Sequence, residues 1–148
     1  MDVRGAVDTA LLMIEPQLAT KRLDSVVDVP PDVFVEADPD RMREILLTLI
    51  SNAMRYTEHG GHVMVDLGYP DGMPEDVVMI RVGDSGRGIP RDLQDEIFEP
   101  SAHAHHPLTG AGPGLAVSRE WARHMGGDIR VRSDEGAGSV FTLSLPRG

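Results

Sequence analysis

The fold is decided by residues 38–57, which read DPDRMREILLTLISNAMRYT. Asp38-Pro39-Asp40 is typical of a helix start, since aspartate and proline both favour the first positions of a helix. After it, apolar side chains recur three and four residues apart, at Met42, Ile45, Leu46, Leu49, Ile50 and Ala53. This spacing predicts an amphipathic helix that buries one face and ends near Thr57.

The hydrophobic pattern on either side of this helix predicts further helices and several strands. Helices are expected over residues 3–21, which include Pro16, and 115–125, with a short one over 91–98; strands are expected over 23–29, 33–37, 62–69, 77–82, 129–132 and 139–145. Strands outnumber single crossovers, which favours an α+β fold over a doubly wound sheet. We therefore expect one domain over residues 1–148, a two-layer α/β sandwich in which three helices cover one face of a mixed β-sheet.

The chain is acidic and contains no cysteine, with 14 Lys and Arg against 24 Asp and Glu for a net charge of −10. Disulfides and thiolate metal sites are therefore excluded. An acidic chain makes poor contact with nucleic acid or an anionic membrane, so we expect neither as a partner. The sequence lacks a signal-peptide pattern and an apolar run of the roughly 20 residues that span a bilayer. We expect a cytoplasmic location, which leaves membrane anchoring of a longer protein open.

One face of the 38–57 helix carries polar side chains four residues apart, at Glu44, Thr48, Asn52 and Tyr56. The amide oxygen of Asn52 is a neutral ligand suited to a hard cation. Magnesium that binds with a nucleotide needs only one or two protein ligands, because phosphates and water supply the rest. The alternative is an asparagine that faces solvent, and the helix taken alone favours that alternative.

A second polar feature is Asp84-Ser85-Gly86-Arg87-Gly88, which directly follows an apolar strand. A carboxylate only accepts hydrogen bonds, so Asp84 is suited to select the exocyclic amine of adenine. Gly86 and Gly88 remove side chains where the backbone must come close to a base or a ribose. The alternative is an acidic turn that merely ends the strand.

A third feature is Gly110-Ala111-Gly112-Pro113-Gly114-Leu115, which opens the last long helix. Free N–H groups at a helix N-terminus bind phosphate, and glycines let those groups approach the ligand. An acidic protein could hold a polyanion locally in this way. The residues before it form a predicted mobile loop, in which phosphate contact, metal binding and plain solvation remain alternatives for His103, His105 and His106.

In this order, residues 38–57, 82–90 (VGDSGRGIP), 97–100 (IFEP), 110–119 (GAGPGLAVSR) and 133–146 (SDEGAGSVFTLSLP) resemble the catalytic, ATP-binding domain of sensor histidine kinases. That domain is similar to those of gyrases and chaperones and has the Bergerat fold. The resemblance extends from about Val3 to Pro146. It implies ATP and Mg²⁺ as cofactors, and it implies that about residues 99–114 form an ATP lid.

The resemblance also implies roles for single residues. Asn52 matches the magnesium-binding asparagine, Arg55 matches a basic residue that faces phosphate, and these two are the expected catalytic residues. Asp84 matches the aspartate that reads adenine. The remaining expected ATP-binding residues are Tyr56, Gly86, Gly88, Ile89, Gly110, Gly112, Gly114 and Leu115.

Three positions depart from the pattern of these kinases. Thr48 stands where a second asparagine is common, and its shorter side chain predicts altered positioning of magnesium or water. Ser101 stands where a phenylalanine is usual, which predicts different packing of the lid. Pro113 replaces a leucine and deletes an N–H that could face phosphate, which predicts weaker phosphate binding.

The implied reaction is transfer of the γ-phosphoryl group of ATP to a histidine on a separate dimerisation and phosphoacceptor domain, with a response regulator as a further partner. The six histidines of this chain lie outside the H-E or H-D signature that carries such an acceptor. We therefore expect an excised catalytic domain that binds ATP and has little activity alone. The alternatives are a degenerate nucleotide-binding regulatory module, an anti-sigma-factor-type serine kinase and, least favoured because Thr48 cannot act as a base, a gyrase-type ATPase.

Overall fold

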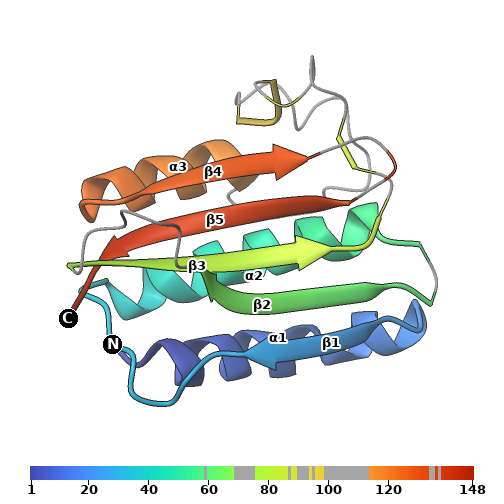
Figure 1. Ribbon diagram of the computed structural model, residues 1–148, viewed down its shortest axis with the longest axis horizontal. Coiled ribbons are helices and arrows are strands. Elements are labelled where there is room, and N and C mark those ends of the chain that lie inside the picture. The colour runs from blue at the N-terminus through green and yellow to red at the C-terminus, as the bar shows by residue number, and fades with distance from the viewer. Residues whose placement is uncertain are drawn as a thin grey trace.

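The chain folds into two layers, a β-sheet and a layer of helices that covers one face of it (Figure 1). The computed structural model describes residues 1–58, 60–68, 76–86, 88–89, 94, 96–98, 114–133, 136 and 138–148. Within these residues the helix layer consists of α1 (Val3–Thr20), α2 (Pro39–Tyr56) and α3 (Gly114–His124). The predicted α+β sandwich with three helices on one face of a mixed sheet is confirmed.

The sheet has five strands in the order β1-β2-β3-β5-β4. Only the first pair is parallel, and the other three pairs are antiparallel. The strand bounds are Asp24–Asp28 for β1, His62–Gly68 for β2, Val77–Asp84 for β3, Asp128–Ser133 for β4 and Ser139–Pro146 for β5. Burial alternates along β2 and β5 because successive side chains of a strand point to opposite faces, and the apolar set packs under the helices.

Helix α2 is the centre of the core and packs against both α1 and α3. It begins where the sequence predicts, because the Asp38 carboxylate accepts hydrogen bonds from the N–H groups of Asp40 and Arg41 at 2.9 and 3.1 Å. All six residues of its predicted apolar stripe are fully buried. The last turns of α2 therefore hold a fixed position against the sheet, and these turns carry Asn52, Arg55 and Tyr56.

Helix α1 ends in a Schellman motif. The Leu23 N–H donates to the Leu18 carbonyl at 2.9 Å, and the Arg22 N–H donates to the Ala19 carbonyl at 3.1 Å. This geometry places Arg22 in the left-handed region, with φ of 54°. The side chains of Leu18 and Leu23 are both buried, so the motif turns the chain from α1 into β1 over an apolar contact.

Two predicted elements differ from the structure. Residues 33–37 do not form a strand of the sheet and make only isolated bridges, Asp2 with Phe34 and Val35 with Arg147. The alternation there reflects burial, since Val33 and Val35 are buried although the segment forms no ladder with a neighbouring strand. In the predicted 91–98 helix, the described part is a 3-10 turn over Glu96–Phe98, and residues 91–93 lie outside the described residues.

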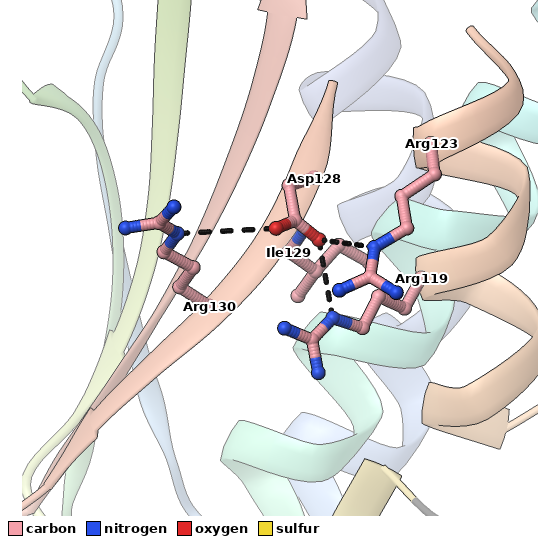
Figure 2. A network of polar contacts seen from close by, with 5 residues as sticks. All are labelled: Arg119, Arg123, Asp128, Ile129 and Arg130. Carbon is pink, nitrogen blue, oxygen red and sulfur yellow. Dashed lines mark hydrogen bonds and ion pairs between the residues drawn. The ribbon is translucent and has the colours of Figure 1, made fainter. Parts of the chain in front are cut away.

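An arginine cluster ties α3 to the edge strand β4 (Figure 2). The Nε atoms of Arg119 and Arg123 each lie 3.1 Å from Asp128 Oδ1, and Arg130 Nε lies 3.9 Å from Oδ2. Burial by itself raises the pKa of Asp128, but hydrogen bonds from Arg119, the Ile129 N–H and Arg123 outweigh it and lower the pKa below its usual value. Arg119 also stacks on Phe98, 4.5 Å from the ring centroid.

Candidate functional site

Asp84 is the last residue of β3 and is buried, with 8% of its surface exposed. One carboxylate oxygen accepts the Gly86 N–H at 2.9 Å, and the other accepts the Ser139 hydroxyl at 2.6 Å. A carboxylate has about four acceptor positions, so two bonds from the protein orient it without exhausting it. The arrangement presents a fixed acceptor that can take a donor from a ligand.

Ser139 is a contact of Asp84 that the sequence alone did not predict. It is the first residue of β5 and is paired with Asp84 in the antiparallel register of β3 and β5. The register alone brings its hydroxyl to the carboxylate, across 55 positions of the sequence. A buried serine opposite an aspartate can be recognised only when the pairing of these two strands is known.

The turn after Asp84 lies directly against the end of α2. A Cβ atom on Gly86 would collide with the carbonyl oxygen of Tyr56, so only glycine fits this contact. On the other side, Gly138 has φ of +83°, and a Cβ there would collide with the Asp84 carbonyl. The two glycines let three chain segments meet around Asp84.

The last turns of α2 hold a polar pair, a buried asparagine and a half-buried arginine. Asn52 has 6% of its surface exposed, and its Oδ1 accepts a hydrogen bond from Arg55 Nη1 at 2.6 Å. Burial lowers the pKa of the Arg55 guanidinium, against an opposing effect of Tyr56, yet arginine remains charged at neutral pH. Asn52 therefore does not face solvent, and the alternative that the helix pattern favoured is wrong.

Lys21 is a second residue that sequence reasoning missed. Its ammonium group donates to the carbonyl of Met54 at 2.8 Å and to that of Arg55 at 3.3 Å. These carbonyls lie at the C-terminus of α2, where a cation is favourable. Lys21 fixes the backbone that carries Arg55 and Tyr56. No pattern in the sequence predicts this contact, because it depends on how α1 packs against α2.

Thr48 lies one turn before Asn52 on α2. Its hydroxyl donates to the Glu44 carbonyl at 2.9 Å, within the helix. The hydroxyl hydrogen is thereby committed to the backbone, and only acceptor capacity remains. Thr48 consequently lacks the free amide donors that an asparagine would bring to this position.

Of the other predicted site residues, the structure describes four and leaves the rest outside the described residues. Gly88 has φ of 74°, and the buried Ile89 donates its N–H to Ser133 Oγ at 2.7 Å, which ties this turn to the end of β4. Gly114 and Leu115 are buried in the first turn of α3, and Gly114 has φ of 72°. Gly110, Gly112, Ser101, Pro113, the three clustered histidines and most of the expected lid lie outside the described residues.

The structure thus brings Asn52, Arg55, Tyr56, Asp84 and Gly86 together at one end of the domain, where α2 and β3 both finish (Figure 1). Among the described residues, no group of three or more histidine, aspartate or glutamate side chains is placed to hold a metal ion. Within the same residues, no helix is long and apolar enough to cross a bilayer.

Sequence comparison places residues 37–148 in the family described as histidine kinase-, DNA gyrase B- and HSP90-like ATPases. The chain is 44% identical over 128 residues to the aerobic respiration control sensor protein ArcB of Escherichia coli K12, covering 83% of this chain and 16% of ArcB. It is 35% identical over 119 residues to the sensor histidine kinase WalK of Bacillus subtilis, covering 78% of this chain and 19% of WalK. The chain therefore spans less than a fifth of the length of these two relatives.

Solved structures agree with this assignment. The catalytic domain of histidine kinase ThkA superposes with a TM-score of 0.85 at 25% identity, covering 99% of this chain and 93% of that domain. Full-length ShkA in complex with AMPPNP superposes with a TM-score of 0.83 at 29% identity, covering 100% of this chain and 30% of ShkA. The chain belongs to the histidine kinase-, DNA gyrase B- and HSP90-like ATPase family, and within that family it is a catalytic domain of the sensor histidine kinase type.

Proposed function

We propose that this chain binds ATP at the end of α2 and β3 and transfers its γ-phosphoryl group to a histidine on a separate phosphoacceptor and dimerisation domain. The observation that carries the proposal is Asp84, a buried carboxylate oriented by Gly86 and Ser139 beside the end of α2. Such an acceptor matches the exocyclic amine of adenine. ShkA, a relative of the same fold, was solved with AMPPNP, which supports an adenine nucleotide as the ligand.

The second part of the proposed site is the Asn52 and Arg55 pair. Asn52 would hold Mg²⁺ through its neutral amide oxygen, and a buried amide oxygen beside nucleotide phosphates suits this hard cation. Bound magnesium would neutralise charge on the phosphates. Arg55 would contact phosphate, since its guanidinium lies within bonding distance of Asn52.

The remaining residues of the proposed site shape and close it. Tyr56, Ile89 and Leu115 would pack around the nucleotide, and Gly86 and Gly88 would let the backbone approach the base. Gly110, Gly112 and Gly114 would let the start of α3 approach the phosphates. Residues 99–114 would act as the lid that excludes water.

The proposed catalysis depends on positioning and charge neutralisation, which is how proteins accelerate phosphoryl transfer. The chain would supply the bound and oriented ATP. The phosphoacceptor domain would supply the accepting histidine, and a response regulator would take the phosphoryl group onward. We propose a cytoplasmic location for residues 1–148, which would act as a single catalytic domain.

Calorimetry with AMPPNP and Mg²⁺ tests the proposal. The wild-type chain should bind, and Asp84→Asn should weaken binding about tenfold or more, because the amide replaces a charged acceptor by a neutral one. Asp66→Asn is the matched control, since Asp66 pairs with Arg81 on the exposed face of the sheet. Absence of wild-type binding at millimolar AMPPNP, or equal binding by Asp84→Asn, would overturn the assignment.

A further inference from the structure

The amide oxygen that is proposed to hold magnesium already holds a cation. Arg55 Nη1 lies 2.6 Å from Asn52 Oδ1, a short hydrogen bond from a charged donor. Asn52 is almost fully buried, and Arg55 is half-buried. The bond is therefore poorly screened by water, and a second cation at the same oxygen would lie against the guanidinium charge.

We propose that Arg55 occupies the Asn52 oxygen in the nucleotide-free chain, and that the nucleotide phosphates must draw the guanidinium away before a metal ion can enter. This inference rests on the function proposed above. Phosphate is the group able to do this, since a guanidinium binds phosphate oxygens with two parallel hydrogen bonds. The metal would then enter together with the nucleotide and not before it.

The exchange is confined to side chains, because the backbone of this turn is held. Lys21 binds the carbonyl of Arg55 and that of Met54, and Gly86 lies against the carbonyl of Tyr56. The apolar face of α2 is fully buried. Rotation of the Arg55 side chain would uncover the amide oxygen without disturbing this packing.

A different explanation is that the contact merely stabilises the helix, as pairs three residues apart often do. The same helix contains such a pair. Arg43 Nη2 lies 3.4 Å from Asp40 Oδ1, and both side chains are largely exposed. The bond between Asn52 and Arg55 is shorter, partly buried and adjacent to the proposed nucleotide site, so the two explanations make different predictions for nucleotide binding.

The difference appears when magnesium is absent. If Asn52 only binds metal, its removal should leave metal-free nucleotide binding unchanged. If Arg55 must leave Asn52 to reach phosphate, removal of Asn52 abolishes that competing bond. Metal-free nucleotide should then bind more tightly to the variant than to the wild-type chain.

The test is a double-mutant cycle in Asn52 and Arg55. ADP affinity is measured by calorimetry, first in EDTA and then with Mg²⁺. In EDTA, Asn52→Ala should bind ADP about three- to tenfold more tightly than wild type, the size expected for one lost competing hydrogen bond. Arg55→Met should bind more weakly, and adding Asn52→Ala to it should have no further effect. With Mg²⁺, Asn52→Ala should bind more weakly than wild type.

Asn52→Ser provides a second substitution, since its short hydroxyl cannot reach the guanidinium as the amide does. Asp40→Ala is the control for loss of an arginine partner on the same helix, and it should leave ADP affinity unchanged. Equal or weaker binding by both Asn52 variants in EDTA would overturn the inference, as would the same gain in the Arg55→Met background. Failure of the wild-type chain to bind ADP in either condition would instead overturn the proposed function.

Discussion

Arg22 has a backbone conformation that suits glycine better than arginine. It is the non-glycine residue with positive φ among the described parts of the chain, and it occupies the position of the Schellman motif where glycine is preferred. Arg22→Gly should therefore raise the free energy of unfolding by about 0.5–1 kcal/mol, because relief of the left-handed strain exceeds the added flexibility of the unfolded chain. Urea denaturation of both proteins measures the difference.

The measurement has an internal control in Arg22→Ala. Alanine removes the side chain but keeps the Cβ atom that causes the strain, so this variant should show no comparable gain. If Arg22→Ala stabilised the protein as much as Arg22→Gly, the effect would belong to the arginine side chain and not to the backbone.

At the same scale, the sequence was informative where one residue carries its own chemistry. Asp84 is suited to adenine because a carboxylate only accepts hydrogen bonds, but an acidic turn remained the alternative until the order of the motifs and the family resemblance favoured the adenine site. Ser139 and Lys21 were not predicted, because each reaches the site through a strand register or a helix packing that no local pattern encodes. The solvent-facing alternative for Asn52 was favoured because periodicity identifies the most hydrophobic face of the helix. It does not show that polar residues at the border of that face are also buried.

At the scale of elements, the contact between the β3 turn and α2 makes a prediction at Gly86. Gly86→Ala should weaken AMPPNP binding and lower the free energy of unfolding by about 1–3 kcal/mol, because its methyl group would collide with the Tyr56 carbonyl. Gly83→Ala is the matched control three residues earlier, in β3, since its Cβ would meet only ordinary contacts of 3.7 Å or more. Thermal denaturation and calorimetry on both variants check the pair.

The two variants distinguish two explanations for the glycines, the close approach of α2 to the turn and the flexibility of the segment. If both lost nucleotide binding equally, flexibility of the segment would explain the glycines better than the approach of α2. If Gly86→Ala alone lost it, the position of the turn against the helix is what the site requires.

Elements were predicted well where the chain marks its own boundaries. Helix α2 begins at Pro39, directly after the capping Asp38, so its start was predictable to within a residue or two. The strand predicted over 33–37 was wrong because alternation reports burial on one side, and burial does not require a neighbouring strand. The sheet order and the single parallel pair depend on contacts between distant segments, which periodicity does not report.

At the scale of the whole molecule, the ion pairs of Asp128 that join α3 to β4 should make the free energy of unfolding depend on pH. The pKa of Asp128 is lowered in the folded state, so its contribution is present above the unfolded value of about 3.9 and is lost as pH falls through the folded value. Asp128→Asn should lower the free energy of unfolding at pH 7 by roughly 1–2 kcal/mol, since the side chain is a quarter exposed and its bonds are partly screened.

Urea denaturation of wild type and Asp128→Asn at several pH values checks the sign. The difference between the two proteins should be constant near neutrality and should shrink below about pH 4. Asp8→Asn is a suitable control, because its pair with Arg4 is exposed on α1. A difference that stayed constant down to pH 3 would show that the charge of Asp128 does not contribute to the free energy of unfolding.

The two chain ends lie together, at the end of the molecule away from the proposed site (Figure 1). Val35 N–H donates to the Met1 carbonyl, and the Gly148 N–H donates to the Phe34 carbonyl, both at 3.0 Å. The 18 residues of α2 separate this end from Asn52 and Arg55 by roughly 27 Å at most. Segments attached at Met1 or Gly148 would therefore join the domain about one length of α2 away from the proposed site.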